Sequence, residues 1–264
     1  MESSKLKNLD NIKNIYFIGI GGSGMFPLAH ILKEKGFNIS GADIYESDTL
    51  QKVRALGIKV YTEHKESNIN GQDLIVFSAA IKETNPEIIA AKKAGIPIIE
   101  RSVMLGLIFN KYSNSIGVSG THGKTTTTSM ITSVLLDAGK EPTAVIGATL
   151  RKLGGNSCIG NSDIIVAEAC EYVDSFLQLN PAISVITNVD ADHLDYFGTL
   201  ENVIKSFRKY ALQTSKLVIY NGDSANAQKA VENITAKTVS FGLDENNDYY
   251  AKNISFGENA KRRV

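Results

Sequence analysis

Two stretches of this sequence run from a short β-branched segment through a glycine-rich turn into an amphipathic segment. The first stretch covers residues 15–36, and the second covers residues 115–139. A strand that leads directly into a helix is typical of β-α-β units, in which helices connect parallel strands. The sequence therefore predicts an α/β fold with mostly parallel sheets. Because the strand–turn–helix pattern starts twice, the sequence also predicts two domains.

The expected strands fall into two series, separated by the polar residues 111–114. We place the domain boundary there, which gives a first domain of residues 1–111 and a second of residues 112–264. Apolar residues at helical spacing predict helices between the strands, and Gly36 and Gly139 stand where two helices are expected to end. The strands are expected at residues 15–20, 39–42, 74–78 and 98–99 in the first series, and at 115–118, 164–167, 183–187, 217–220 and 238–241 in the second.

The composition limits what the chain can bind. Its 28 lysines and arginines equal its 28 aspartates and glutamates, so no net basic field favours non-specific nucleic-acid binding. The apolar runs, such as residues 103–109, are far shorter than the roughly 18 residues that span a membrane, and residues 1–14 lack an apolar signal region. Cys158 and Cys170 are too few for a disulfide framework. We therefore expect a cytoplasmic protein without nucleic-acid or membrane partners, whose anion sites are built locally.

Residues 19–24 read GIGGSG, which puts Gly19, Gly21 and Gly24 in the spacing of a nucleotide-binding turn. Glycines there allow a phosphate to approach a helix N-terminus, whose amides and dipole favour negative charge. Asp43, after the second strand, stands about where an acidic ribose ligand lies in a dinucleotide fold. The pattern predicts a bound diphosphate and leaves its nucleotide open; the alternative is that the glycines only permit the turn.

Residues 117–128 read GVSGTHGKTTTT, in which Gly123, Lys124 and Thr125 match the end of a phosphate-binding loop. In such loops backbone amides surround the phosphates, the lysine neutralises them and the hydroxyl binds Mg²⁺. The first glycine of the usual pattern would fall on Val118, so this loop relies on Gly120 and Gly123 instead. Successive threonines are poor helix formers, which argues against the alternative of a merely capped helix.

Acidic residues and a histidine follow two later strands. Glu168 and Glu171 come directly after residues 164–167, and His193 lies in the acid-rich segment 188–198. Because the carboxyl ends of parallel strands share one sheet edge, we expect these side chains near the phosphate-binding loop. Either glutamate could hold Mg²⁺, and the combination favours a two-metal nucleotide site over a solvated loop.

On these motifs the chain resembles the Mur ligase family of peptidoglycan synthesis. The matching stretches, in family order, are GIGGSGM at 19–25, SAAIKETNPE at 78–87, GTHGKTTTT at 120–128, EACEYVDSF at 168–176 and NVDADHLDYF at 188–197. The resemblance implies a Rossmann-like UDP-binding domain followed by a P-loop-type ATP-binding domain. It also implies an ATP-dependent amide ligase that uses Mg²⁺ and joins L-alanine to UDP-N-acetylmuramate through an acyl phosphate.

The resemblance further implies roles for single residues. Lys124 would stabilise the transferring phosphoryl group and Thr125 would bind the first Mg²⁺, while Glu168 and His193 would bind or position the second. The catalytic residues are then Lys124, Glu168 and His193, and the metal ligands are Thr125, Glu168 and His193. The implied ATP-binding residues are Gly120, Thr121, His122, Gly123, Lys124, Thr125 and Thr126. The implied UDP-sugar-binding residues are Gly19, Gly21, Gly22, Ser23, Gly24, Met25, Asp43, Ser78 and Ala79.

Several alternatives stay open at this point. These ligases continue into a third domain with no counterpart here, so we expect a shortened form that needs that domain for turnover. Within the family, a ligase that attaches recycled tripeptide to the same UDP-sugar is the closest alternative, although EACEYVDSFLQLNP favours the alanine-adding enzyme. A NAD-binding oxidoreductase would explain GIGGSG but not GTHGKT, and a noncatalytic nucleotide-binding module would explain both without turnover.

Overall fold

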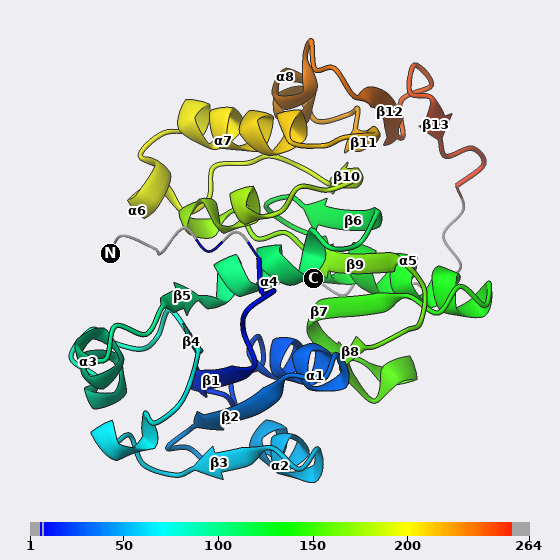
Figure 1. The fold of residues 1–264 in the computed structure, drawn as a ribbon. Helices are drawn as coiled ribbons and strands as arrows, with labels where there is room; N and C mark the ends of the chain where they lie inside the picture. The colour runs from blue at the N-terminus through cyan, green and yellow to red at the C-terminus, as the bar shows by residue number, and fades with distance from the viewer. Residues whose placement is uncertain (1–5, 7, 255–264) are drawn as a thin grey trace.

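The computed structural model describes residue 6 and residues 8–254. They form a five-stranded sheet, in the lower part of Figure 1, and an eight-stranded sheet in the upper part. The segment ENAKRRV at 258–264, which bears on the expectation of an incomplete second domain, lies outside the described residues. None of the helices in this part of the chain combines the length and the apolar character that a membrane crossing needs.

The first sheet has parallel strands in the order β3-β2-β1-β4-β5. The strands are β1 (Asn14–Ile18), β2 (Asn38–Ala42), β3 (Lys59–Tyr61), β4 (Leu74–Phe77) and β5 (Ile98–Glu100). The helices are α1 (Phe26–Glu34), α2 (Asp48–Ala55), α3 (Pro86–Lys93) and α4 (Arg101–Phe109), with a 3-10 turn η1 (Glu66–Asn68). The direction of strand succession reverses between β1 and β4, and ligands of open α/β sheets bind at the carboxyl edge of such a point. The first glycine turn follows β1 and therefore lies at this position.

The second sheet has the strand order β13-β12-β11-β10-β6-β9-β7-β8, and only β8 is antiparallel to its neighbour in the described residues. The strands are β6 (Asn114–Ser119), β7 (Thr143–Leu150), β8 (Gly155–Cys158), β9 (Ile164–Glu168), β10 (Ile183–Ile186), β11 (Leu217–Asn221), β12 (Lys237–Gly242) and β13 (Tyr249–Tyr250). The helices are α5 (Lys124–Asp137), α6 (Leu194–Phe197), α7 (Leu200–Leu212) and α8 (Ala225–Val231), with 3-10 segments η2 (Arg151–Leu153) and η3 (Tyr172–Gln178). Because β6 pairs with both β9 and β10, the glycine turn after β6 is flanked by two strand ends.

Every predicted strand is present within two residues of its expected ends, whereas β3, β7, β8 and β13 were not predicted. The predicted strand at 15–20 ends at Ile18, because Gly19 has a φ of 83° and begins the turn. β7 contains Gly147 and β8 begins at Gly155. Because glycine is uncommon in strands, it weakens the sequence pattern from which a strand is predicted. Gly36 and Gly139 follow α1 and α5 with φ values of 88° and 65°, which confirms them at the helix ends.

Helix α4 connects the two halves of the molecule. A Cβ atom on Gly106 would lie 2.5 Å from the carbonyl oxygen of Gln178, so glycine allows the backbones of α4 and η3 to meet. The Asn110 side chain donates to the same carbonyl at 3.1 Å and accepts from the Asn180 amide at 2.8 Å. One hydrophobic cluster includes Phe109 of α4 and residues of both sheets. The two halves are therefore packed together around α4.

A buried polar network lies in the core of the first sheet. The Tyr16 hydroxyl donates to Glu87 at 2.6 Å, and the Asn68 amide donates to the same carboxylate oxygen at 2.7 Å. The other oxygen of Glu87 lies 2.6 Å from Nδ1 of His64. Tyr16 and Glu87 are fully buried, so each polar atom here depends on its partners rather than on water.

Candidate functional site

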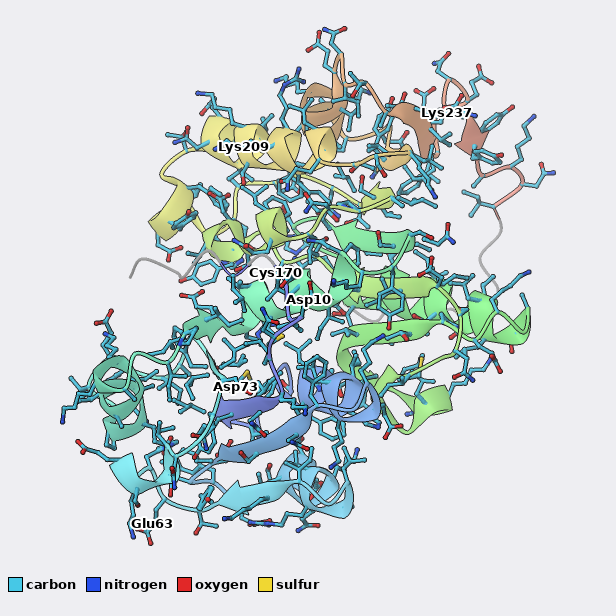
Figure 2. All side chains as sticks on the ribbon, viewed as in Figure 1. Asp10, Glu63, Asp73, Cys170, Lys209 and Lys237 are labelled. Atoms are coloured by element: carbon cyan, nitrogen blue, oxygen red, sulfur yellow. The ribbon has the colours of Figure 1, made fainter. Side chains whose placement is uncertain are left out.

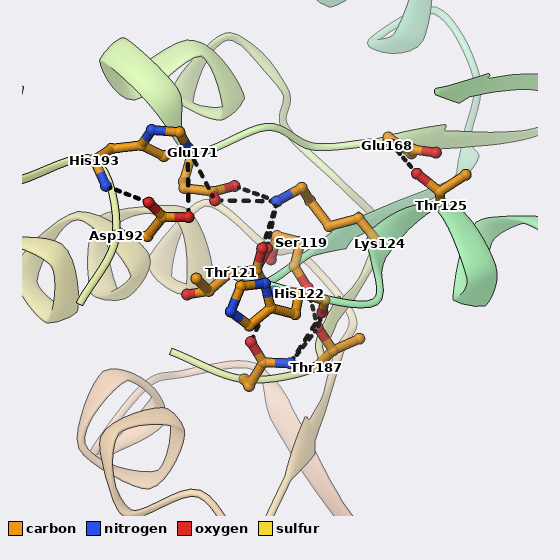
Figure 3. Close-up of polar contacts among 12 residues, drawn as sticks. Ser119, Thr121, His122, Lys124, Thr125, Glu168, Glu171, Thr187, Asp192 and His193 are labelled. Carbon is orange, nitrogen blue, oxygen red and sulfur yellow. Dashed lines mark hydrogen bonds and ion pairs between the residues drawn. The ribbon is translucent and has the colours of Figure 1, made fainter. Parts of the chain in front are cut away.

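The predicted phosphate-binding loop between β6 and α5 is held by the residues that follow β10 (Figure 3). Thr121 and His122 donate their backbone amides to Asn188, at 3.1 Å to its carbonyl and 2.8 Å to its side-chain oxygen. The Thr187 hydroxyl donates to the His122 carbonyl at 2.6 Å. A Cβ atom on Gly120 would lie 2.0 Å from that hydroxyl, and its φ is 139°, so only glycine fits this position. The sequence motif thus forms a glycine turn between a strand and a helix, as predicted.

Lys124 reaches back over this loop. Its ammonium donates to the carbonyls of Gly120 at 2.6 Å and Thr121 at 3.2 Å, and to the carboxylate of Glu171 at 2.9 Å. The Glu171 side chain is only 2% exposed, so its charge requires this cation. Sequence reasoning considered Glu171 only as a possible metal ligand, and the structure shows it as the partner of the loop lysine.

Thr125 and Glu168 come together at the start of α5. The Thr125 hydroxyl donates to Glu168 at 3.1 Å, because β9, which ends at Glu168, lies beside β6 in the sheet. The second carboxylate oxygen of Glu168 accepts from the Gly147 amide at 2.5 Å. Thr126 follows in the first turn of α5, where helix amides have no intrahelical acceptor. This end of the loop therefore offers a hydroxyl, a carboxylate and free amides.

His193 lies on the other side of Lys124, beside Glu171 rather than Glu168. Its Nε2 atom is 3.9 Å from Glu171, and its ring centroid is 4.7 Å from that of Tyr172. Its backbone is left-handed, with a φ of 52°, which turns the chain into α6. No hydrogen bond or ion pair joins Glu168 to His193 in the described residues. Of the three predicted metal ligands, Thr125 and Glu168 therefore lie together, and His193 lies apart from them, beside Glu171.

The side chains around the loop supply part of what Mg²⁺ requires. Magnesium prefers oxygen ligands and usually takes one or two carboxylates together with phosphate oxygens and water. Thr125 and Glu168, 3.1 Å apart, fit this requirement. The described residues contain no group of three or more His, Cys, Asp or Glu side chains that could form a complete cage. Phosphate and water would have to supply the remaining ligands.

The first glycine turn is stabilised by the carboxylate of Asp43. Asp43 accepts from the amides of Gly21 at 2.9 Å and Tyr45 at 3.1 Å, so each of its carboxylate oxygens is hydrogen-bonded to a backbone amide. A Cβ atom on Gly21 would lie 2.9 Å from Oδ2 of Asp43, so a residue without a side chain is favoured at this position. The predicted ribose ligand is thus a structural partner of the turn in this structure.

The other predicted UDP-sugar residues lie around the same turn. Gly22 accepts from the amide of Met25 at 2.9 Å, which closes the turn before α1. Ser78 follows β4, and a Cβ atom on Gly19 would lie 3.7 Å from its Cβ. Ala79 is the next residue and is exposed. The end of β4 and the first turn therefore lie side by side.

The hairpin of β7 and β8, which was not predicted from the sequence, contacts the first glycine turn and the Glu168 side chain. Asn156 of β8 donates its side-chain amide to the Ser23 carbonyl at 2.8 Å. Gly147 of β7 binds Glu168, as described above. The sequence carries no signal for these roles beyond the small residues of the hairpin. One short antiparallel pair therefore contacts both the first turn and the carboxylate that accepts from Thr125.

Cys170 lies between Glu168 and Glu171 and near α4 (Figure 2). Burial raises the pKa of its thiol above the usual value, with a smaller opposing contribution from a backbone hydrogen bond. A raised pKa keeps the neutral thiol at physiological pH and makes it a poor nucleophile. Cys170 is therefore a packing residue of the site rather than a reactive group.

Two family models match the chain. The model described as "Mur ligase family, catalytic domain" matches residues 14–113, and the model described as "Mur ligase middle domain" matches residues 118–263. The UDP-N-acetylmuramate–L-alanine ligase of Acetivibrio thermocellus is 44% identical over 98% of this chain and 56% of its own length. The ligase of the same name from Caldicellulosiruptor bescii is 45% identical over 91% of this chain and 53% of its own length. The chain spans about half the length of the curated relatives it matches.

Solved structures of ligases with related names also align with this chain. The UDP-N-acetylmuramate-alanine ligase of Thermotoga maritima aligns with a TM-score of 0.78 and 30% identity, over 89% of this chain and 53% of that chain. The UDP-N-acetylmuramate:L-alanyl-gamma-D-glutamyl-meso-diaminopimelate ligase of Neisseria meningitides aligns with a TM-score of 0.80 and 29% identity, over 88% of this chain and 78% of that chain. Because the middle-domain model alone matches more than half of the residues, the chain belongs to the Mur ligase family.

Proposed function

We propose that this chain carries the nucleotide-binding part of an ATP-dependent ligase that joins L-alanine to UDP-N-acetylmuramate in peptidoglycan synthesis. The observation that carries the proposal is the set Lys124, Thr125 and Glu168 around one glycine loop. The 44% identity to ligases of this name supports the choice of substrates. We propose residues 1–111 as the UDP-sugar domain and residues 112–264 as the ATP domain. We place the reaction in the cytoplasm, where ATP and UDP-sugars are available.

In the proposed reaction, a carboxylate oxygen of UDP-N-acetylmuramate attacks the γ-phosphorus of ATP, and ADP leaves. The amine of L-alanine then attacks the resulting acyl phosphate, and inorganic phosphate leaves as the amide forms. Such catalysis consists mainly of positioning and charge stabilisation. When bound, Mg²⁺ would neutralise phosphate charge, and Thr125 and Glu168 are the side chains that would hold it.

Lys124 and His193 have distinct parts in this proposal. Lys124 is held over the loop by two carbonyls and Glu171, so its ammonium is in place before ATP arrives. An ammonium has three donors and can exchange one of these partners for a phosphate oxygen. We assign His193, beside Glu171, the positioning of the phosphoryl group or of its metal from the opposite side.

A second candidate is the ligase that attaches a recycled tripeptide to the same UDP-sugar. It is favoured by the TM-score of 0.80 to the tripeptide-type ligase, close to the 0.78 of the alanine-type ligase. The two candidates share the first step and differ in the amine. The first half of the molecule therefore has the same role in both.

Two measurements test the proposal. Calorimetry of this chain with UDP-N-acetylmuramate, with ATP and Mg²⁺, and with NAD should show binding of the first two and not of NAD. Phosphate release by the protein that contains this chain should require L-alanine, and the tripeptide should not replace it. NAD binding without UDP-sugar binding would contradict the ligase assignment, and a requirement for tripeptide would favour the second candidate. Binding of both nucleotides without phosphate release under any condition would favour a noncatalytic module.

A further inference from the structure

The β7–β8 hairpin leaves the core of the second half at Gly147. Residues 143–146 of β7 are buried, whereas none of residues 147–156 is buried. The pairing of β7 with β9 ends at Val145, and the register between β7 and β8 shifts between Val145 and Leu150. We call residues 147–156 the outer hairpin. Because it lies outside the buried core and outside the ladder with β9, its position depends on the contacts at its two ends.

One end of the outer hairpin is attached to Glu168. The Gly147 amide donates to Oε1 of this carboxylate at 2.5 Å, and the Thr125 hydroxyl donates to Oε2 at 3.1 Å (Figure 3). A Cβ atom on Gly147 would lie 2.5 Å from Oε2, so glycine permits this close approach. A single carboxylate is thus shared between the outer hairpin and the second glycine turn.

The other end of the outer hairpin is attached to the first half of the molecule. The Asn156 side-chain amide donates to the Ser23 carbonyl of the first glycine turn at 2.8 Å. The ammonium of Lys52, in α2, donates to the Gly154 carbonyl at 3.4 Å. Strand β8 accordingly lies beside α1, the helix that follows the first turn (Figure 1). The outer hairpin is therefore a short covalent path between the side chain of Glu168 and the backbone of the first turn.

We propose that the outer hairpin couples the two nucleotide sites, so that each nucleotide binds more tightly when the other is present. The inference rests on the proposed function of both turns. Once Glu168 and Thr125 hold a metal-bound nucleotide, Glu168 fixes Gly147 at one end of the hairpin, and Asn156 then fixes Ser23 at the other. A nucleotide-sugar that enters the first turn meets a segment that is already ordered, and it loses less conformational freedom on binding. Asn156 acts through Ser23 and is a positioning residue.

Calorimetry of the full chain measures this coupling as a ratio of dissociation constants. UDP is titrated into the chain alone and into the chain saturated with ATP and Mg²⁺; UDP lacks the carboxylate that reacts, so no turnover interferes. The dissociation constant of UDP should fall by about 5-fold or more when ATP is present, and that of ATP should fall by the same factor when UDP is present.

Asn156→Ala cuts the path at the first turn. The ratio should fall to about 1, while UDP alone and ATP alone should each bind within about 2-fold of the unsubstituted chain, because neither site loses a ligand-binding group. The matched control is Asn161→Ala, which removes an exposed asparagine just beyond β8 and should keep the ratio. Lys52→Ala removes the weaker contact to Gly154 and should reduce the ratio only in part.

The outcomes separate this inference from the proposed function. If both nucleotides bind but neither affects the other, or if Asn156→Ala keeps the ratio, the inference is wrong and the proposed function stands. Equal weakening of UDP with and without ATP would make Asn156 a part of the first site alone and would also overturn the coupling. A lower thermal midpoint with loss of both affinities would indicate a structural role instead. If the unsubstituted chain binds no uridine nucleotide, the proposed function fails, and the inference fails with it.

Discussion

The two glycine turns follow central strands of two parallel sheets, yet they obtain their positive charge differently. The second turn contains its cation, Lys124, which is held by the buried Glu171. The first turn contains none and lies against Arg101, which comes from another strand end. A charge within the loop can be recognised in a motif, whereas a charge supplied by a neighbouring element becomes visible only in the fold.

The largest effect is expected from Lys124→Ala. It removes the phosphate-binding charge and leaves Glu171 without its cation, so ATP affinity should fall by about 100-fold and phosphate release by at least about 1000-fold. UDP-sugar affinity should remain almost unchanged, because the first turn does not use this lysine. Calorimetry with both nucleotides measures the difference, with Lys140→Ala as an exposed control. Equal loss of both affinities would show that the two sites are not separate.

Alanine at a glycine should also affect the two turns unequally. Gly120→Ala forces a Cβ atom to within 2.0 Å of the Thr187 hydroxyl at a φ of 139°. The free energy of unfolding should fall by about 3 kcal/mol, and ATP binding should be lost. Gly24→Ala meets only the flexible Arg101 side chain at 3.2 Å and should cost less than about 1 kcal/mol. Urea unfolding of both variants measures the two losses in free energy of unfolding. Equal losses would contradict the expected difference between the two turns.

A smaller effect is expected in the core of the first half. Tyr16→Phe removes a donor from the buried Glu87 and should lower the free energy of unfolding by about 1–3 kcal/mol. Burial, with the Glu87 hydrogen bond, raises the pKa of Tyr16 far above its usual value of about 10. The folded state therefore keeps the neutral hydroxyl, and the stability it contributes is complete below about pH 10 and lost as the pH rises further. Urea unfolding at pH 8 and above pH 10 should show a steeper alkaline loss in the unsubstituted chain than in Tyr16→Phe.

The smallest effect is expected from the same substitution in the second half. The Tyr210 hydroxyl is buried without a hydrogen-bond partner in the described residues, and burial raises its pKa as well. Tyr210→Phe removes this unsatisfied group, so the free energy of unfolding should rise or change by less than about 0.5 kcal/mol. A loss as large as that of Tyr16→Phe would mean that the hydroxyl has a partner, such as a buried water.

The sequence predicted the parallel sheets and the two turns because their signals are local. The strand before Gly19 is an apolar run, and the strand before Gly120 contains the β-branched Ile116 and Val118. The edge of the sheet at which ligands bind follows from the strand direction. Glu168 could be placed near the loop for the same reason, since it directly follows the predicted strand at 164–167. These predictions needed only the order of elements along the chain.

The partner of Lys124 could not be predicted in this way. After β9 the chain enters η3 through Val173 and Asp174, with left-handed φ values of 53° and 56°. A β-branched valine opposes this conformation, so local preference gives no hint of it. The route of this segment decides that Glu171, and not Glu168, meets Lys124 and His193. The contact between Asn156 and Ser23 could not be predicted either, because the residues of β8 are not typical of strands.

The close approach of Gly106 to Gln178 affects how the molecule can be divided. A cut after residue 111 assigns α4 to the first half, but one face of α4 is covered by η3 of the second half. A fragment of residues 1–111 alone would expose that face, with Gly106 and Asn110, and would lack the part of the hydrophobic cluster that the second half supplies. An exchange of halves between related ligases would therefore have to transfer matched versions of α4 and η3, because a larger side chain at position 106 would clash with the Gln178 carbonyl.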